Sequence, residues 1–290
     1  MIRRPPRSTL SSSSAASDVY KRQFCRCVNG EIDMFLEEER LSRKKHDNMP
    51  VKTVMELQES NFAGVTGLEY HDYSLRDTCN FFDVIFRKKI PDHDYRTYNQ
   101  HHYLHACCGF YNSGFEEADV VVVDGLGNFF DEEHHECATR WHIKKPAEIK
   151  LLERQGASRF GTKTDRHGYW PMGIGMAYAS ISDYLGFGQL GSGKVMGLAP
   201  YGKEDPNIKP FVIDGRVNSK LFYRTKYSAN FIPYDYLPEE VNIKDQRFMN
   251  LAYRLQKDFE KWMTNFILKC ESKNIVLTGG CALNLSIIHI

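Results

Sequence analysis

The feature that most constrains the fold is a run of four valines at 120–123, which ends in Asp124-Gly125-Leu126-Gly127. A continuous β-branched run of this kind predicts a strand that is buried on both faces of a sheet. Asp124 then lies at the carboxyl end of that strand, where the active sites of α/β folds gather. The run therefore predicts an α/β domain with a polar site at the tip of this strand.

Two histidines precede the valine run at helical spacing. Residues 101–112 are predicted to be helical, which places His101 and His105 one turn apart on the same face. Two neutral imidazoles and a carboxylate suit a divalent metal that also binds phosphate. Two histidines at this spacing are more often ordinary surface or core residues, so the spacing alone leaves both interpretations open. His102 is predicted to point away from the other two.

Composition narrows the functional classes. With 290 residues, of which 42% are hydrophobic, the chain can form a sizeable core as one large domain or two lobes. A net charge of +1 argues against a nucleic acid or an anionic membrane as partner, and no apolar stretch approaches membrane-spanning length. The eight cysteines lack the paired spacing of zinc sites, so we expect reduced thiols in the cytoplasm.

Residues 1–23 differ in composition from the rest of the chain. They are rich in Arg and Ser, and Asp18 is their one acidic residue. A transit peptide or a disordered arm has such a composition. Translated sequencing adapter has it too, and we favour that explanation. We expect this leader to be non-native and to pack against nothing, with the globular domain covering residues 24–290.

Further elements are predicted from periodicity and turn signals. Asn29-Gly30 indicates a hairpin turn. Helices are predicted at 51–59, 75–86, 176–185 and 245–272, and strands at 32–36, 135–143, 149–152 and 274–278. The last strand is predicted to be buried. It runs into Gly279-Gly280, where paired glycines let the backbone approach a ligand and a following helix offers its first amides.

Residues 188–194 fit the opening of a P-loop, G-x-x-x-x-G-K. The motif then requires Ser or Thr to hold magnesium, and this chain has Val195. The preceding segment is also predicted to be a helix, whereas a P-loop follows a strand. We therefore reject a P-loop NTPase and keep only the interpretation that a glycine-rich loop bearing Lys194 can bind an anion.

Five segments carry a resemblance to a known family. They are Glu-Glu-Glu-Arg-Leu-Ser-Arg-Lys-Lys-His-Asp (37–47), His-His-x-x-His-Ala (101–106), Val-Val-Asp-Gly (122–125), Gly-Lys-Val-Met-Gly-Leu-Ala-Pro-Tyr-Gly-Lys (193–203) and Leu-Thr-Gly-Gly-Cys-Ala-Leu-Asn (277–284). In order and spacing, residues 24–290 resemble the carbamoyltransferases of the nodulation-factor and antibiotic-tailoring type. The block at 193–203 is the most specific of the five.

The resemblance implies an α/β, actin-like ATPase fold of the duplicated ribonuclease-H-like kind, which the tRNA threonylcarbamoyl-transferase catalytic subunit shares. It implies that a YrdC-like domain makes carbamoyl-adenylate from carbamoyl phosphate and ATP. The present domain would then transfer the carbamoyl group to a hydroxyl of a small-molecule acceptor such as a sugar or an antibiotic.

The resemblance also assigns site residues. His101, His105 and Asp124 match the metal ligands, for iron(II) in this fold. The residues that match stretches at the nucleotide end of the cleft are Gly125, Gly127, Lys194, Gly279, Gly280 and Asn284. We expect Lys44 or Lys194 to neutralise phosphate charge during transfer, and Asp124 to serve catalysis through the metal. His46 is an acid/base candidate near the acceptor, with a solvated structural role as its alternative.

Several parts of the family pattern lie outside this sequence. They are the first strand, a later Gly-Asp segment with a fourth metal ligand, and the YrdC-like domain. We therefore expect a fold incomplete at both ends and a fragment that is inactive alone. We also expect a homodimer that binds neither nucleic acid nor membrane.

Two other functions stay open at this stage. One is a threonylcarbamoyl-transferase-like enzyme acting on a nucleotide or tRNA, against which the lack of a basic patch argues. The other is a non-catalytic module of the same fold that binds metal and nucleotide. The donor set itself would accept iron, zinc or manganese.

Overall fold

The computed structural model describes residues 23–28, 31–43, 52, 101–131, 133–158, 168–224 and 229–289. The chain divides into two units, residues 1–98 and 99–290, and each is described by itself. Residues 1–22 lie outside the described residues, as do Lys44, His46 and, apart from Lys52, the helices predicted at 51–59 and 75–86.

The described part of the first unit is a hairpin followed by a short helix. Strands β1 (Gln23–Val28) and β2 (Glu31–Glu37) pair antiparallel, and α1 (Glu38–Ser42) follows directly. The predicted hairpin and its second strand at 32–36 are therefore confirmed. The charge run starts at Glu37, the last residue of β2, and continues through the helix α1.

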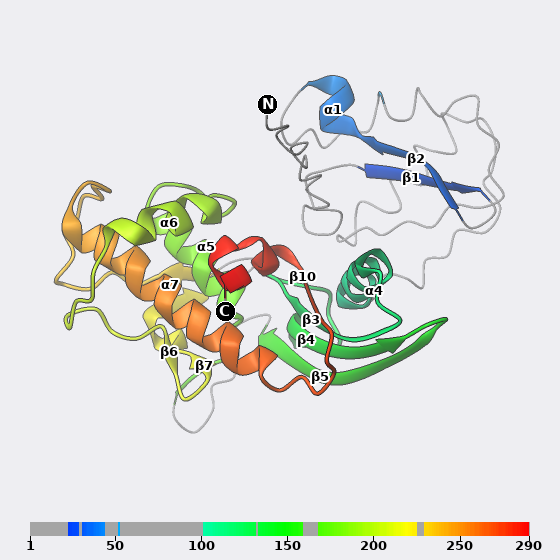
Figure 1. Cartoon of the computed structure of the whole chain (residues 1–290). Helices are drawn as coiled ribbons and strands as arrows, with labels where there is room; N and C mark the ends of the chain where they lie inside the picture. Colours follow the sequence, from blue (N-terminus) through cyan, green and yellow to red (C-terminus); the bar gives the residue numbers. More distant parts are fainter. Residues whose placement is uncertain are drawn as a thin grey trace, which may run out of the picture. The chain divides into compact units, whose positions relative to one another are not determined.

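The second unit is built on a four-stranded mixed sheet with the strand order β10-β3-β4-β5 (Figure 1). Strands β3 (Glu117–Val123), β4 (His134–Lys144) and β5 (Glu148–Ser158) form an antiparallel meander. Strand β10 (Ile275–Thr278) pairs parallel with β3, so that both strands end at the same edge of the sheet. The predicted α/β class and the strands at 135–143 and 149–152 are confirmed.

Helices and short elements complete the second unit. The α-helices are α4 (His101–Ser113), α5 (Ile174–Tyr184), α6 (Ser192–Leu198) and α7 (Gln246–Ile267). The short strands are β6 (Val212–Ile213), β7 (Arg216–Val217), β8 (Phe222–Arg224) and β9 (Ala229–Phe231). The 3-10 helices are η2 (Ala199–Tyr201), η3 (Ser219–Leu221), η4 (Gly280–Leu283) and η5 (Leu285–His289).

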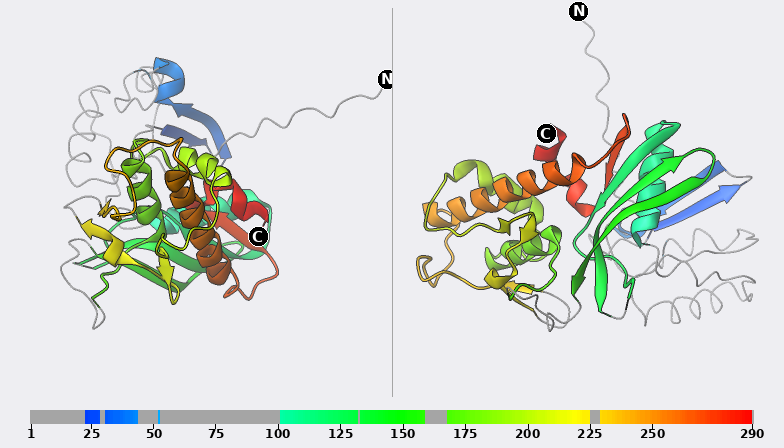
Figure 2. Two further views of the ribbon diagram at one scale, coloured as in Figure 1. Left: turned by 90° about the vertical axis from the view of Figure 1, so that its left-hand side faces the viewer. Right: turned by 90° about the horizontal axis from the view of Figure 1, so that it is seen from below.

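Both faces of β3 are buried, which explains the uninterrupted valine run. Val120 and Val122 pack on the face that carries Phe110 of α4. Val121 and Val123 belong to the larger core on the opposite face, with helices α5 and α7. Successive side chains of a strand alternate between faces, so burial of both faces requires apolar residues at every position. Figure 2 shows α4 and α7 on opposite sides of the sheet.

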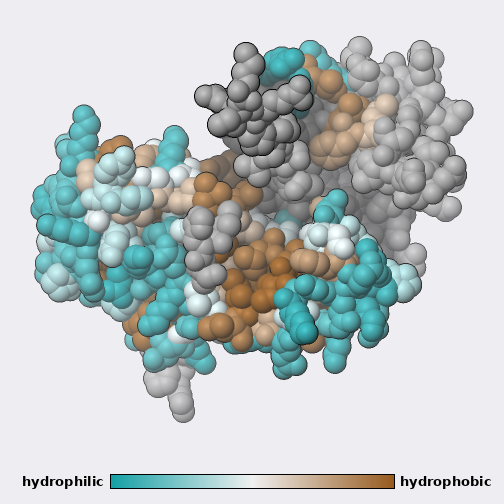
Figure 3. All heavy atoms as spheres, in the orientation of Figure 1, coloured by the Kyte–Doolittle hydropathy of each residue, from teal (hydrophilic) through white to brown (hydrophobic). Residues whose placement is uncertain are grey.

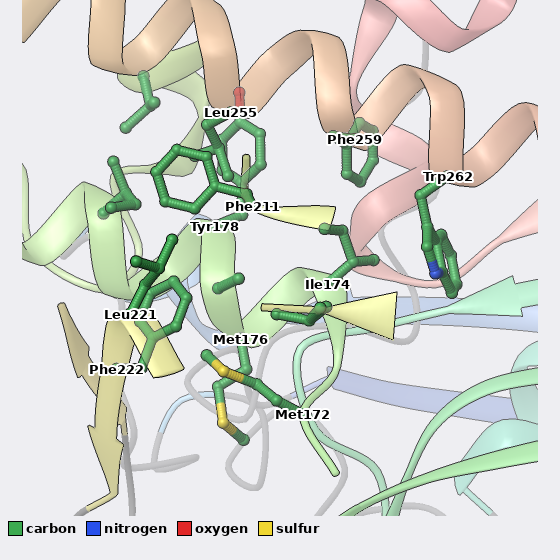
Figure 4. Close-up of a cluster of buried hydrophobic side chains, with 14 of the residues drawn as sticks. Met172, Ile174, Met176, Tyr178, Phe211, Leu221, Phe222, Leu255, Phe259 and Trp262 are labelled. Atoms are coloured by element: carbon green, nitrogen blue, oxygen red, sulfur yellow. The ribbon is translucent and has the colours of Figure 1, made fainter. Parts of the chain in front are cut away.

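Helix α7 supplies one side of the larger core. Its fully buried residues Phe248, Leu251, Leu255 and Phe259 recur at intervals of three and four, as an amphipathic helix requires. Figure 4 shows Leu255 and Phe259 facing the side of the core that includes Tyr178 of α5. The helices predicted at 176–185 and 245–272 are confirmed, although α7 ends at Ile267 because the chain there turns toward β10.

Among the described strands, β10 lies at the edge of the sheet, and the prediction of a buried strand is correct only in part. Val276 is buried, whereas Ile275 is 39% exposed. In Figure 3, which has the orientation of Figure 1, apolar side chains gather in the middle of the visible surface, in the region that β10 occupies in Figure 1. Among the helices that the structure describes, none is both long enough and apolar enough to span a membrane.

Asp119 connects the sheet to the turn between α7 and β10. Its side chain is 2% exposed, and its carboxylate accepts hydrogen bonds from the amides of Glu271 (2.8 Å) and Ser272 (3.2 Å). The Nδ1 atom of His142 lies 2.9 Å from the other carboxylate oxygen. Burial alone would raise the pKa of Asp119, but these hydrogen bonds lower it below its ordinary value.

We expect Asp119→Asn to lower the free energy of unfolding by about 2–3 kcal/mol near neutral pH, because the backbone amides lose a charged acceptor. The folded-state pKa lies below the ordinary one, so this stabilisation is present above the ordinary pKa and is lost as the pH falls through the folded value. Urea unfolding of both proteins between about pH 7 and pH 3 should show a difference that shrinks in acid. A difference that stays constant over this range would contradict the prediction. Glu148→Gln, on the exposed start of β5, is the control and should change stability by less than about 0.5 kcal/mol.

Candidate metal centre

The structure brings His101, His105 and Asp124 together at the tip of β3. The Nε2 atom of His101 lies 2.7 Å from Asp124 Oδ2 and 3.1 Å from Nε2 of His105. The Nε2 atom of His105 lies 3.3 Å from the same carboxylate oxygen. These three atoms, which we call the donor triangle, form a group of His, Cys, Asp or Glu ligand atoms close enough to hold a metal, and it is the one such group in the described part of the chain.

The donor triangle has the dimensions of a metal site. Ligand atoms about 2.1 Å from one ion lie about 3.0 Å apart at right angles and about 3.4 Å apart in a tetrahedron. The edges of the triangle, 2.7, 3.1 and 3.3 Å, come close to both values. Two imidazoles and one carboxylate leave coordination positions for further ligands, an arrangement that iron(II), zinc and manganese accept.

The two oxygens of Asp124 have different neighbours. Oδ2 faces the imidazoles, whereas Oδ1 accepts hydrogen bonds from the amides of Gly125 (2.8 Å) and Gly280 (3.3 Å). Burial alone would raise the pKa of Asp124, but the hydrogen bonds from His101 and His105 hold it well below its ordinary range. The carboxylate is therefore ionised at neutral pH and offers a fixed negative charge to a cation.

Side chains from neighbouring segments bind the start of α4. Asn128 Oδ1 accepts a hydrogen bond from the amide of His101 (3.0 Å), and Glu136 Oε2 accepts one from the amide of His102 (3.4 Å). Glu136 is 2% exposed, and its Oε1 pairs with Nε of Arg154 at 3.1 Å. Burial raises the pKa of Glu136, while Arg154 and the His102 amide oppose that rise. Neither Asn128 nor Glu136 was predicted, because one Asn after a turn and one Glu within a strand form no motif.

His102 is a contact between α4 and β4 rather than part of the donor triangle. Its imidazole is fully buried, with Nδ1 3.0 Å from Thr139 Oγ1, which also accepts a hydrogen bond from Trp141 Nε1 (2.8 Å). Burial lowers the pKa of His102 to about 3, so the ring is neutral. A Cβ atom added at Gly127 would come within 2.8 Å of this ring, so that position requires glycine for packing.

Glycines from two strand ends surround Asp124. Gly279 follows β10 with a φ of +89°, and a Cβ there would collide with the carbonyl oxygen of Val123. Gly279 therefore permits the close approach of the β10 tip to the β3 tip. At Gly125, in contrast, an added Cβ would meet nothing within 4 Å. Gly280 begins η4, a short 3-10 helix, and its amide reaches Asp124 as the prediction of a helix start at this turn implies.

The side chain of Asn284 takes part in a polar network that joins the C-terminal turn to α7. Its Nδ2 donates to Gln256 Oε1 (2.9 Å), and its Oδ1 accepts from Ser286 Oγ (2.8 Å). Gln256 Oε1 also accepts a hydrogen bond from the hydroxyl of Tyr178 in α5 (2.7 Å). Asn284 thus contributes to the packing of the turn in which it lies.

The structure does not bring Lys194 to the donor triangle. The N-terminal end of α5 lies against Asp124, because a Cβ added at Gly175 would come within 2.7 Å of the Asp124 carbonyl oxygen. Lys194 lies in α6, and its Nζ atom is 5.7 Å from the centre of the Phe187 ring, which follows the C-terminal end of α5. An open cavity of about 720 Å³ is also found there, lined by Phe187 and Arg247 among others.

The segment that precedes the P-loop-like sequence is the helix α5, as predicted, and Lys194 itself lies in α6. A P-loop lysine follows a strand and a glycine-rich turn. The helix before the loop therefore agrees with the rejection of a P-loop NTPase.

Comparison with known families now adds to this geometry. The family model described as carbamoyltransferase N-terminus matches residues 73–288, and the chain belongs to that family. The matched range includes all three residues of the donor triangle and the glycines around them. It begins after the charge run at 37–47, which contains Lys44 and His46.

The relatives include two nodulation proteins. The nodulation protein NolNO of Sinorhizobium fredii is 24% identical over 207 residues, which cover 62% of this chain and 27% of that protein. NolO of Bradyrhizobium diazoefficiens is 33% identical over 107 residues, covering 36% of this chain and 16% of that protein. The uncharacterized protein sll1178 of Synechocystis sp. is 27% identical over 209 residues, which cover 64% of this chain and 30% of that protein. The matches thus span less than a third of the length of each relative.

Proposed function

We propose that this chain is the transfer domain of an ATP-dependent O-carbamoyltransferase. In this proposal the carbamoyl group passes from carbamoyl-adenylate, made from carbamoyl phosphate and ATP, to a hydroxyl of a small-molecule acceptor. The observation that carries the proposal is the donor triangle of His101, His105 and Asp124 in a chain of the carbamoyltransferase family. The sheet, an antiparallel meander with a fourth strand parallel to its first, is compatible with the actin-like fold that the resemblance implies.

His101, His105 and Asp124 would hold the divalent ion, for which the resemblance favours iron(II). When bound, the ion supplies Lewis-acid polarisation of the carbamoyl carbonyl. The side chains of His101 and Asp124 are 17% and 11% exposed, whereas His105 is 2% exposed. Substrate oxygens therefore reach the triangle along its His101–Asp124 edge, while His105 closes the buried corner.

The proposed transfer forms one bond and breaks another. The acceptor hydroxyl oxygen attacks the carbamoyl carbon, and the bond from that carbon to the adenylate phosphate oxygen breaks. AMP leaves with the electron pair of that bond, and the hydroxyl proton passes to a base. His46 remains the predicted acid/base for this proton, and Lys44 the predicted partner of the phosphate charge.

The test uses the protein expressed from the full-length gene. With carbamoyl phosphate, ATP and a panel of sugars and aminoglycosides, we expect release of AMP and a product heavier by one carbamoyl group, measured by mass spectrometry. His105→Ala should reduce product formation at least about 100-fold, since it removes the buried corner of the triangle.

A matched control is available on β4. His134→Ala removes a histidine that bonds Asp131 and takes no part in the triangle, so it should leave the rate within about 2-fold. Binding of metal and ATP without any carbamoylated product would instead support the non-catalytic module, and wild-type activity of His105→Ala would contradict the proposed role of the triangle.

A further inference from the structure

The direction in which the two imidazoles point depends on the first turn of α4. His101 and His105 belong to one helix, and each residue turns about 100° around its axis. A small rotation or shift of the helix start would therefore move both Nε2 atoms away from Asp124 together. Metal ligands tolerate errors of only about 0.2 Å. Some contact must hold this helix end in register with the carboxylate.

Three contacts from residues 128–139 do so. The side-chain oxygens of Asn128 and Glu136 accept hydrogen bonds from the amides of His101 and His102. Thr139 lies 3.0 Å from the buried ring of His102. Adjacent residues of α4 are thus bound through their backbone and through a side chain that points away from the triangle.

The segment that makes these contacts is hydrogen-bonded to Asp124 and to the turn that follows it. The Asp124 amide donates to the carbonyl of Cys137 (3.1 Å), the Gly127 amide to that of Glu136 (2.7 Å), and the Glu136 amide to that of Asn128 (2.9 Å). Asn128 and Glu136 are 9% and 2% exposed. The carboxylate of the triangle and the two acceptors of the helix start are therefore parts of one hydrogen-bonded segment.

From this arrangement we infer that Asn128 and Glu136 are positioning residues of the metal centre. They hold the first turn of α4 in the orientation in which His101 and His105 face Asp124. Neither side chain is a member of the donor triangle, so both act through the ligands. The inference rests on the proposed function, because the ion is part of that proposal.

The test is a titration of the chain with Co²⁺ alone, followed by its visible absorption. We expect Asn128→Ala to weaken Co²⁺ binding about 10- to 100-fold and to change the shape of the absorption bands, because the ligands are reoriented. Asn128→Asp keeps an oxygen at the same place and should bind within about 3-fold of the wild type. Glu136→Gln keeps both polar atoms but loses the charge that pairs with Arg154. Its Co²⁺ affinity should lie between those of Asn128→Ala and Asn128→Asp.

The control is Ser113→Ala at the opposite end of the same helix. It removes the hydrogen bonds of Ser113 Oγ with the Phe110 carbonyl and the Phe115 amide. It therefore tests whether loss of helix stability alone weakens the binding of Co²⁺. We expect its Co²⁺ affinity to stay within about 2-fold of the wild type, while thermal unfolding reports its stability separately. Equal Co²⁺ affinity of Asn128→Ala and wild type, or equal weakening in Ser113→Ala, would overturn the inference alone. A wild-type chain that binds no Co²⁺ would overturn the proposed metal centre and this inference with it.

Discussion

Asp124→Ala is expected to abolish tight binding of a divalent ion, raising the dissociation constant well beyond the roughly 100-fold loss typical of residues that only support a ligand. Asp124 provides the one negative charge of the donor triangle, and two neutral imidazoles remain without it. Isothermal titration with Mn²⁺ or Co²⁺, together with metal analysis of the purified protein, measures the loss.

A second substitution separates the charge of Asp124 from its role as a hydrogen-bond acceptor for two backbone amides. Asp124→Asn keeps an oxygen that can accept from the amides of Gly125 and Gly280, but it removes the charge that faces His101. Asp124→Asn should lose ion binding almost as completely as Asp124→Ala. Its free energy of unfolding should lie closer to that of the wild type. Asp131→Asn, at an exposed acid beside His134, is the control and should bind normally. Retention of ion binding by Asp124→Asn would show that the charge is not required.

Gly279→Ala is expected to have the largest effect on stability. The position has a φ of +89°, which is strained for any residue with a side chain, and the new Cβ would collide with the backbone of Val123. Because β3 is paired with a strand on each side, its backbone cannot move aside cheaply, and we expect a loss of at least about 3 kcal/mol in the free energy of unfolding. Chemical denaturation of both proteins measures it.

The control for this substitution is Gly193→Ala in α6. A Cβ added there would meet nothing within 4 Å, and alanine favours a helix over glycine by about 1 kcal/mol. We therefore expect Gly193→Ala to be neutral or stabilising. A Gly279→Ala protein as stable as the wild type would contradict the proposed close approach of the two strand tips.

The parts of this fold that could be predicted from the sequence are those specified by local spacing. The valine run predicted a strand buried on two faces, and the interval between His101 and His105 predicted a common helix face. Both signals need only a few consecutive residues, because they follow from the periods of a strand and a helix. The convergence of these histidines with Asp124 was expected from the family resemblance, because the spacing alone left the metal interpretation open.

What could not be predicted depends on pairing between distant segments. Nothing near Ile275 indicates that β10 is an edge strand, since that depends on which strand pairs beside it. Asn128 and Glu136 acquire a role only when β4 meets α4. The role of Gly202, in the block at 193–203 that carries the resemblance, is also non-local, because a Cβ atom there would collide with the backbone of Met249 in α7.

The carboxylate of Asp124 joins interactions that close loops of very different length. Its bonds to His101 and His105 connect residues about twenty positions apart, whereas its bond to the Gly280 amide spans 156 positions. Short loops close at a lower entropic cost than long ones, so during folding the imidazoles and the carboxylate can meet before β10 has docked. Without the amide of Gly280, the same oxygen of Asp124 keeps only its local hydrogen bond from Gly125, so the orientation of this carboxylate depends on strand β10 as well as on helix α4.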